Sequence, residues 1–277
     1  MKKREDKEYE MDAKDFDFQR IAEGYKRRPF LHKQIIERFK EDVTSRIFSN
    51  GLDIGCGAGL SSKALKAICR HVTGTDISGE MIAVAREVCP NAEEYDFFVS
   101  KAEELPDFDK KFNIVTAAGV VQWVDKDLFL QKMSNVMGDY GHLLIYDFWI
   151  SDKMKDCSAY TTWWHDDYLK EFPRPPRNES VWTKKDVSRY GFLMKDQIRH
   201  EMEYEFDQDS FIEFMMIQSN VNAKIDDGEN SVKTVRKWFD QTTAPLFQGE
   251  KRTVIFAGYS WYMELQSKSR QSIAAPV

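Results

Sequence analysis

The sequence predicts an α/β protein with a doubly wound, mostly parallel sheet of seven strands. In the first 150 residues, short apolar and β-branched segments alternate with segments of helical periodicity. This alternation is typical of βαβ units, in which helices cover both faces of a parallel sheet. Two more strand patterns follow after residue 200, and the second of them is long. Together these patterns account for seven strands in one open sheet.

The expected elements follow the chain in order, after an N-terminal helical cover. Runs of apolar and β-branched residues predict strands at residues 51–54, 71–76, 94–100, 112–120, 142–149, 201–206 and 252–265. Apolar residues spaced as on one face of a helix predict helices at residues 61–70, 78–88, 126–137 and 209–220. Ser78 is suited to cap the second of these helices at its N-terminus.

The chain is expected to fold as one domain that carries an insertion. No internal repeat or low-complexity linker divides the 277 residues, and α/β folds commonly reach this length as one unit. The alternation of strands and helices breaks after residue 150, where Trp, Tyr, proline and charged residues become frequent. We therefore expect an N-terminal cover, a core, an insertion, final strands and helices, and a disordered tail at residues 1–45, 46–150, 151–195, 196–265 and 266–277.

Composition narrows the class of protein and its partners. The chain has no run of eighteen apolar residues, and its charged N-terminus lacks the apolar centre of a signal peptide. A net charge of -6 argues against nucleic acid as a partner. The four cysteines have no CxxC spacing, which is typical of free thiols in a reducing cytoplasm and predicts no metal site. We expect a cytoplasmic protein without a membrane partner, either monomeric or homodimeric.

The segment "LDIGCGAG" places Asp53 two residues before the first of three alternate glycines, Gly55, Gly57 and Gly59. It ends the first expected strand, and α/β sheets bind ligands at this edge. Glycines there let the backbone approach a ligand closely. A dinucleotide fingerprint would need glycine at Leu60, and a P-loop would need a Lys-Ser/Thr pair after the last glycine. An acid before the glycines would repel a pyrophosphate, so it favours a ligand with an ammonium group.

A second acid, Asp76, ends the second expected strand seventeen residues after Gly59. A carboxylate at that position can accept both hydroxyls of a ribose. A ligand that combines a ribose with a cationic amino-acid end fits S-adenosylmethionine. The alternative is that the glycine turn and the strand-end acid are ordinary turn chemistry. Their pairing at the first two strand ends favours the cofactor.

Residues 50–150 resemble a class I S-adenosylmethionine-dependent methyltransferase. "LDIGCGAG" matches the first motif of that family, and "VTGTDIS" resembles the second, in which the acid holds the ribose and the next apolar residue packs on adenine. "VSKAEELP", "FNIVTAAGVVQWVD" and "NVMGDYGHLLIYDF" resemble the adenine-contacting segment, the fourth motif and the fifth motif. The resemblance implies cofactor contacts by Asp53, Gly55, Cys56, Gly57, Gly59, Asp76, Ile77, Met81, Ala102, Glu103, Ala118 and Trp123.

Three positions depart from the family pattern. Lys101 replaces the acid that contacts adenine, so the resemblance implies that the main chain at Ala102 and Glu103 holds the base. Tyr140 replaces one glycine of the fifth motif. Gln122 stands where several relatives have a histidine, and an amide cannot take a proton at neutral pH. A general base at residue 122 is therefore not expected.

The N-terminal segment "GYKRRPFLHKQII" resembles a segment of small-molecule methyltransferases that act on trans-aconitate or on the malonyl group of a carrier protein. In those relatives it precedes the core and helps to close over the cofactor. The resemblance implies this role for Tyr25, Arg28 and Pro29. The alternative is that an amphipathic helix here only covers the sheet.

The acceptor of the methyl group is the hardest feature to predict. Five of the seven tryptophans lie between residues 123 and 182, which suggests an apolar or cationic acceptor pocket, with residues 151–195 as its lid. The expected pocket residues are Gln122, Trp123, Trp149, Trp163 and Trp164. The rival interpretation is that these rings only fasten the insertion onto the sheet. His165 precedes two acids and is a candidate base, and the alternative is a surface histidine.

These observations favour methylation of a small molecule at oxygen or nitrogen. Methyl transfer is an in-line displacement, and positioning alone can supply roughly 7–11 kcal/mol of the barrier. Two alternatives stay open: a methyltransferase that acts on tRNA or protein, and a protein that binds the cofactor without transfer. The acidic chain shows no basic face for the first, and the motifs alone cannot exclude the second.

Overall fold

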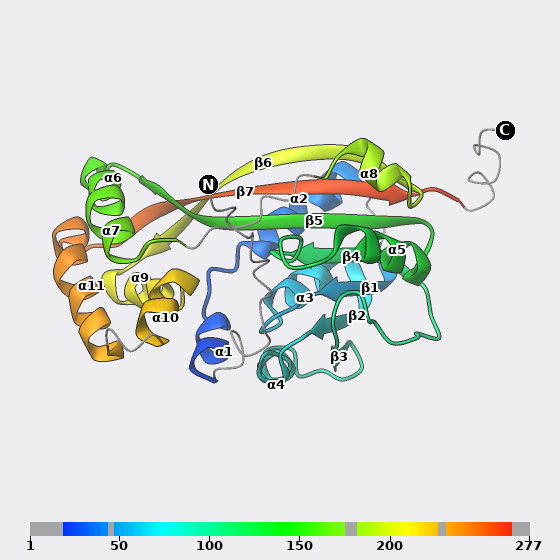
Figure 1. The fold of residues 1–277 in the computed structure, drawn as a ribbon, viewed down its shortest axis with the longest axis horizontal. Helices are drawn as coiled ribbons and strands as arrows, with labels where there is room; N and C mark the ends of the chain where they lie inside the picture. Colours follow the sequence, from blue (N-terminus) through cyan, green and yellow to red (C-terminus); the bar gives the residue numbers. More distant parts are fainter. Residues whose placement is uncertain (1–18, 44–46, 175–181, 227–230, 268–277) are drawn as a thin grey trace, which may run out of the picture.

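A computed structural model of the chain describes residues 19–43, 47–174, 182–226 and 231–267. At its centre is one sheet of seven strands in the order β3-β2-β1-β4-β5-β7-β6, from the lower to the upper edge in Figure 1. The strands are β1 (Phe48–Ile54), β2 (Cys69–Asp76), β3 (Tyr95–Val99), β4 (Phe112–Ala118), β5 (Met137–Met154), β6 (Phe192–Phe206) and β7 (Arg252–Leu265). Strands β1 to β5 pair in parallel, and β7 runs antiparallel to β5 and β6. The predicted sheet is confirmed.

The strand order reverses between β1 and β4. The chain passes from β1 outward to β2 and β3, and then returns to β4 on the other side of β1. Connections that leave in opposite directions open a crevice beyond the carboxyl ends of these strands, which is where α/β sheets bind ligands. Asp53 of β1 and Thr116 of β4 are register partners at this edge. Asp53, which the sequence singled out, therefore lies at the reversal point.

Each face of the sheet packs against its own helices, because alternate side chains of a strand point to opposite faces. Ile114 and Leu144 belong to the buried cluster that contains residues of α2 and α3. Their neighbours Val115 and Leu143 belong to the cluster that contains residues of α5 and α8. The helices beside the core are α2 (His32–Val43), α3 (Leu60–Leu65) with the short 3-10 helix Lys66–Ile68, α4 (Gly79–Val88), α5 (Lys126–Val136) and α8 (Lys184–Ser188).

Several expected boundaries move because tertiary pairing overrides local periodicity. The helix expected at residues 61–70 ends at Ile68, since Cys69 is buried and pairs with Phe48 as the first residue of β2. Strand β5 continues to Met154, and β6 already begins at Phe192. These extensions hydrogen-bond to β7 along its whole length. Residues 252–265 form a strand as expected.

A group of helices, which we call the helical module, lies at the left end of Figure 1, to the left of β1 to β4. Its elements are α6 (Ser158–Trp163), the π-helix Trp164–Tyr168, α7 (Leu169–Glu171), α9 (Gln208–Met215), α10 (Ser219–Asp226) and α11 (Val232–Phe247). Only part of the expected insertion enters this module, because α8 packs against the sheet instead. Helices from after β6 complete it, a contribution that the sequence did not reveal.

Helix α1 (Gln19–Tyr25) bridges the core and the helical module. Its Ala22 packs against Met81 of α4, and Gly24 lies against Ile217, which would be 2.4 Å from a Cβ added at the glycine. No helix among the described residues is long and apolar enough to cross a membrane. The tail expected at residues 266–277 lies almost entirely outside the described residues.

Candidate functional site

The carboxylate of Asp53 is the buried anchor of the glycine loop, residues 55–59. Its Oδ2 accepts hydrogen bonds from the hydroxyls of Ser61 at 2.6 Å and Ser62 at 2.7 Å, and its Oδ1 accepts one from Thr116 at 2.8 Å. The residue is 0% exposed. Burial raises the pKa of Asp53 to about 6, although the three hydroxyls oppose this shift. Asp53 therefore ties β1, β4 and α3 together, and it presents no surface to the ammonium group that the sequence suggested as its partner.

The three glycines of the loop all have positive φ, at 63° for Gly55, 51° for Gly57 and 86° for Gly59. L-residues rarely adopt this conformation, so glycine is needed at each turn of the loop. A Cβ on Gly55 would come within 2.4 Å of Val120, whereas a Cβ on Gly57 would meet nothing within 4 Å. The loop is therefore closed on the side of β4 at Gly55 and open to a ligand at Gly57.

Asp76 at the end of β2 reaches back to the same loop. Its Oδ2 accepts a hydrogen bond from the N–H of Gly57 at 2.8 Å, and its Oδ1 accepts one from the N–H of Ser78 at 2.9 Å. Burial raises the pKa of this carboxyl, and the backbone N–H groups oppose that shift. Each oxygen retains acceptor capacity. The geometry therefore leaves Asp76 able to accept two further donors, such as a pair of ribose hydroxyls.

The other expected cofactor residues surround this loop with different degrees of exposure. Ile77 is 38% exposed and offers an apolar surface directly after Asp76. Met81, by contrast, is 2% exposed and packs among Ala22, Ala58 and Val84, so its side chain supports the loop from the side of α1 and α4. Cys56 is also buried, at 4%. The side chains of Met81 and Cys56 therefore shape the site without facing it.

The segment after β3 contacts the segment after β4. Ala102 packs in the cluster on the α5 face, and Glu103 Oε1 accepts a hydrogen bond from the N–H of Asp125 at 3.0 Å. Trp123 lies in the turn before Asp125 and is 41% exposed. Gln122 contacts the carbonyl oxygen of Gly119 at 3.5 Å. These residues form one wall beside the carboxyl end of β4, where Ala118 is half-buried.

Tyr25 and Arg28 lie beside the glycine loop on the side of α1. The guanidinium carbon of Arg28 lies 3.5 Å from the centre of the Tyr25 ring, a cation–π contact. Tyr25 packs against the cluster that contains Ala58 of the loop. The Nε atom of Arg28 is buried and has no hydrogen-bond partner among the described residues. A buried guanidinium nitrogen of this kind is suited to bind an anionic group of a ligand.

Sequence reasoning missed a polar pair next to Arg28. His32 Nδ1 lies 2.9 Å from the hydroxyl of Tyr146, which is 0% exposed, and the His32 ring makes an edge contact with Phe148. Burial and the charge of Arg28 lower the pKa of His32 to about 3, so the ring is neutral at physiological pH. Since the two residues are 114 positions apart, only the register of β5 against α2 could have predicted their contact.

The residues expected around the acceptor are separated in the structure. Trp163 and Trp164 are each 3% exposed and pack in the aromatic core of the helical module, where Trp163 contacts Phe211 and Trp238. This packing supports the fastening interpretation for both rings. Trp149 on β5 is half-buried and lies 6.3 Å from the ring of Tyr259. Trp149 and Trp123 are therefore the two expected rings with surface available to a ligand.

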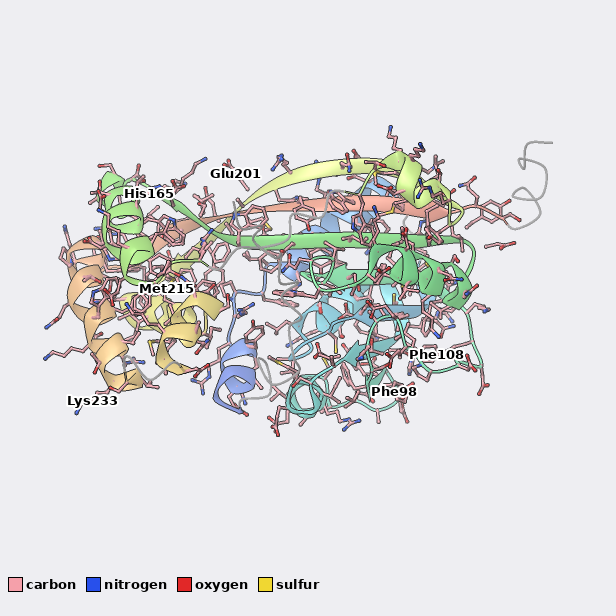
Figure 2. All side chains as sticks on the ribbon, in the orientation of Figure 1. Phe98, Phe108, His165, Glu201, Met215 and Lys233 are labelled. Atoms are coloured by element: carbon pink, nitrogen blue, oxygen red, sulfur yellow. The ribbon has the colours of Figure 1, made fainter. Side chains whose placement is uncertain are left out.

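His165 occupies the outer end of the helical module, near α6 in Figure 2. Its side chain is 55% exposed, and Nε2 lies 2.9 Å from Oδ2 of Asp152, which is not one of the two acids that follow it in sequence. A general base must reach the proton that it removes within about 3 Å. The surroundings of His165 fit a surface ion pair, so we assign it no step.

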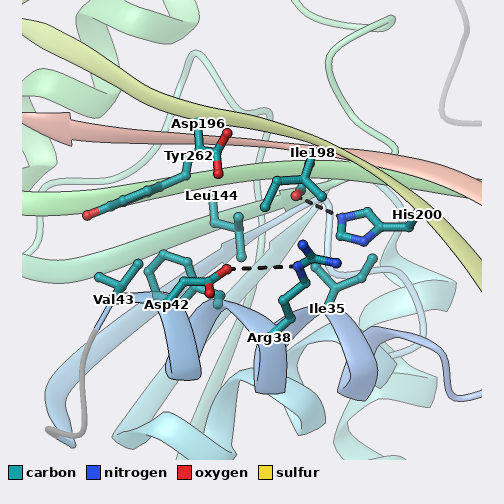
Figure 3. Close-up of a pocket in the computed structure, with 11 residues that line it drawn as sticks. Ile35, Arg38, Asp42, Val43, Leu144, Asp196, Ile198, His200 and Tyr262 are labelled. Carbon is teal, nitrogen blue, oxygen red and sulfur yellow. Dashed lines mark hydrogen bonds and ion pairs between the residues drawn. The ribbon is translucent and has the colours of Figure 1, made fainter.

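A cavity between α2 and the strands β5 to β7 lies apart from these residues (Figure 3). Arg38 pairs with Asp42 along α2 on one side of the cavity, and His200 bonds to Ser260 on the sheet side. The cavity holds about 30 Å³, which is enough for one water molecule. Neither the glycine loop nor Asp76 lines it. It is too small and too remote from the loop to hold the cofactor.

Among the described residues, no group of three His, Cys, Asp or Glu side chains is arranged to bind a metal ion. The polar groups that converge on the glycine loop are instead those that bind hydroxyls and charged organic groups. The acceptor oxygens of Asp76 match the hydroxyls of a ribose, and the guanidinium of Arg28 matches a carboxylate.

Residues 52–145 match the family model of the methyltransferase domain. A ubiquinone biosynthesis O-methyltransferase of Azorhizobium caulinodans is 32% identical over 121 residues, which cover 42% of this chain and 48% of that protein. An uncharacterized methyltransferase of Schizosaccharomyces pombe is 28% identical over 137 residues, which cover 46% and 48% of the two chains. The chain thus spans about half the length of the curated relatives that it matches.

Solved structures share the fold over a larger part of the chain. A candidate type II methyltransferase from Anaeromyxobacter dehalogenans superposes with a TM-score of 0.60 at 17% identity, over 84% of this chain and 95% of that one. The YcgJ protein of Bacillus subtilis gives a TM-score of 0.51 at 16% identity, over 84% and 99%. The matched segment and this shared fold agree: residues 52–145 are similar to a methyltransferase domain, and the sheet has the Rossmann-like fold of the solved methyltransferase structures.

Proposed function

We propose that this protein transfers the methyl group of S-adenosylmethionine to a small-molecule acceptor. The observation that carries the proposal is the hydrogen bond between Asp76 and the N–H of Gly57. It lies beside open space, because a Cβ added at Gly57 would meet no atom within 4 Å. The bond joins the two motifs that the family uses for the ribose and the amino-acid end of the cofactor. One ligand that spans both motifs would satisfy the remaining acceptors of Asp76.

The proposed cofactor contacts follow from the positions of the side chains. Asp76 accepts the ribose hydroxyls, Ile77 packs on adenine, and the main chain at Ala102 and Glu103 holds the edge of the base. Arg28, stacked on Tyr25, donates to the carboxylate of the methionine end, which gives its buried Nε a partner. The backbone of Gly55, Gly57 and Gly59 and the wall residues Ala118 and Trp123 complete the proposed contacts. The buried side chains of Asp53, Cys56 and Met81 support the loop from behind.

The proposed chemistry needs little from the protein beyond positioning. The acceptor atom attacks the sulfonium methyl in line with the breaking carbon–sulfur bond, and the protein holds the two together. Gln122 and Trp123 stand on the wall after β4, where the acceptor would approach. We propose no general base, because Gln122 cannot take a proton and His165 is remote from the glycine loop.

The type of acceptor is supported less directly. The ubiquinone biosynthesis O-methyltransferases among the relatives are named for small-molecule products, which agrees with a small acceptor here. The resemblance of the Tyr25–Arg28 segment to methyltransferases of trans-aconitate and malonyl carriers is a finer part of the same proposal. The assignment of residues 151–195 as the cover of the acceptor site is also part of this proposal, and residues 175–181 of that segment lie outside the described residues.

A labelled-methyl experiment tests the proposed function. The protein is incubated with S-adenosylmethionine carrying a labelled methyl group and with a small-metabolite extract, and separately with tRNA and a protein extract. We expect label in a small molecule, resolved by mass spectrometry. Label only in tRNA or protein would replace the small acceptor by a macromolecule. Binding of the cofactor without labelled product in any arm would contradict transferase activity.

A further inference from the structure

An acid and two aromatic rings, which we call the acid–aromatic patch, lie together on the extended part of β5 and β7. Asp147 is the register partner of Tyr259. Trp149 lies two residues after Asp147 on β5, so both side chains are on the same face of the sheet. The rings of Trp149 and Tyr259 are 6.3 Å apart, and Tyr259 stacks on Trp261 at 4.9 Å. The patch faces away from α2, since the alternate residues Tyr146 and Phe148 are those that contact His32.

The side chains of the patch are partly exposed to solvent. Asp147, Trp149 and Tyr259 are all half-buried. Neither of the two rings is a member of a buried hydrophobic cluster among the described residues, in contrast to Trp163 and Trp164. Aromatic rings that are neither buried nor scattered singly are typical of surfaces that bind a ligand.

A short chain of contacts connects the patch to the glycine loop. A Cβ on Gly55 would come within 2.4 Å of Val120. The preceding residue, Gly119, lies so close to Asp147 that its Cβ would be 3.3 Å from Oδ1 of that carboxylate. Only the turn after β4 therefore separates Asp147 from the loop proposed to hold the methionine end of the cofactor. Trp123, at 41% exposure, ends the same turn.

Asp147 and the aromatic rings favour a cation at the patch, and Arg199 of β6, the register partner of Tyr259, lies one strand further from Asp147. Burial raises the pKa of the Tyr259 phenol, and the negative charge of Asp147 raises it further, so the phenol stays neutral and its ring keeps an uncharged π face. A carboxylate next to the faces of Trp and Tyr is the combination that recognises ammonium groups in proteins. A neutral hydroxyl acceptor would gain little from either feature.

We propose that Asp147, Trp149 and Tyr259 form the subsite for a cationic amine, so that the methyl acceptor is an amine nitrogen. This inference rests on the proposed transferase function. The amine enters as an ammonium ion and loses one proton to solvent. Its lone pair then forms the nitrogen–carbon bond while the carbon–sulfur pair returns to sulfur, which leaves a neutral thioether. The positive charge thus passes from sulfur to nitrogen, where the carboxylate and the ring faces stabilise it.

Two probes of one shape test the subsite apart from turnover. Choline carries a quaternary ammonium, and 3,3-dimethylbutan-1-ol is its neutral isostere. Calorimetry with the protein saturated by S-adenosylhomocysteine measures the affinity of each. We expect choline to bind about tenfold or more tightly than the isostere, as a desolvated cation–π contact beside a carboxylate implies. Equal affinities in the wild-type protein, or binding of neither probe, would overturn the proposal.

Variants of single residues show which side chains cause the preference for choline over its neutral isostere. Asp147→Asn keeps the acceptor oxygen for the N–H of Phe148, 2.8 Å away, and should lower the choline-to-isostere ratio several-fold. Trp149→Leu should lower it as well. Glu201→Gln removes an exposed acid of β6 that lies two strands from Trp149 on the same face. Because Glu201 already pairs with Lys153, the variant should leave the ratio unchanged. A ratio that is unchanged in both Asp147→Asn and Trp149→Leu, or lowered equally in Glu201→Gln, would contradict the subsite.

The two levels of the account fail in different ways. If the wild-type protein does not bind S-adenosylhomocysteine, the proposed function fails first. If it binds that product tightly but shows no preference for the cation, only the amine subsite is wrong. Thermal unfolding of each variant shows that a lost preference comes from the folded protein.

Discussion

Asp76 Oδ2 accepts a hydrogen bond of 2.8 Å from the backbone N–H of Gly57, nineteen residues earlier in the chain. The contact links the ends of β1 and β2, where the segments lie that resemble the first and second motifs of class I methyltransferases. It holds the carboxylate towards the open side of the glycine loop while Asp53, fully buried, fixes the loop from below. One acid thus organises the backbone, and the other is left to meet a ligand.

Gly55 should be irreplaceable because of Val120 as well as its own backbone. Gly55→Ala forces an L-residue to φ 63° and places its Cβ 2.4 Å from Val120. The positive φ alone costs about 1–2 kcal/mol, and the clash adds to it. Val120→Ala removes the clashing methyl, so the double variant should be less destabilised than the sum of the two single variants. Denaturant unfolding of all four proteins measures this, and strict additivity would show that the contact is relaxed in solution.

Trp163 should stabilise the fold without contributing to the site. It is 3% exposed in the aromatic core of the helical module. Trp163→Ala should therefore lower the free energy of unfolding by about 3–5 kcal/mol. Trp123 is 41% exposed, and Trp123→Ala should change the free energy of unfolding by less than about 0.5 kcal/mol. If Trp163→Ala melts like the wild-type protein but loses turnover, the ring belongs to the acceptor pocket after all.

His32 should make the fold sensitive to acid. The pKa of His32 is about 3 in the folded protein and 6.5 in the unfolded chain. Between pH 3 and pH 6.5 the unfolded chain therefore binds a proton that the folded protein does not bind. Stability linked to His32 is therefore lost as the pH falls from about 6.5 towards 3. Asp53 acts in the opposite sense, because its folded pKa of about 6 lies above 3.8 and acid relieves the cost of its buried charge.

The variant His32→Asn isolates the histidine contribution. Asparagine keeps an acceptor near the position of Nδ1 for the Tyr146 hydroxyl, and it does not titrate. The free energy of unfolding of the wild-type protein should fall relative to this variant between pH 6.5 and pH 4.5, while Asp53 contributes equally to both. Parallel pH profiles would mean that His32 is protonated in the folded protein.

The position of the glycine loop beside Asp76 could be predicted from the sequence because it depends on local geometry. Gly55, Gly57 and Gly59 follow one strand and Asp76 ends the next, and parallel strands bring their carboxyl ends to one edge. Sequence periodicity was sufficient there. It was not sufficient to separate Asp53 from Asp76, since only the structure shows three hydroxyls around Asp53.

The neighbours of the residues expected around the acceptor could not be predicted because they depend on long-range register. Trp163 and Trp164 look like pocket residues in a polar segment, yet helices from after β6 bury them. The pairing of Asp147 with Tyr259 comes from the antiparallel register of β5 and β7, over more than one hundred residues of sequence. The contact of His32 with Tyr146 likewise joins α2 to β5. No local pattern encodes these neighbours.

The affinity for the cofactor product in wild-type protein and in Asp76→Ala tests the central claim most directly. Hydrogen bonds to a charged group contribute roughly 1.5–3 kcal/mol each, and 1.4 kcal/mol corresponds to a factor of ten. Calorimetry with S-adenosylhomocysteine should therefore show binding by the wild-type protein and at least tenfold weaker binding by the variant, with Asp76→Asn between the two. Unchanged affinity in an Asp76→Ala protein that still unfolds cooperatively would contradict the assignment of Asp76 and of the site built around it.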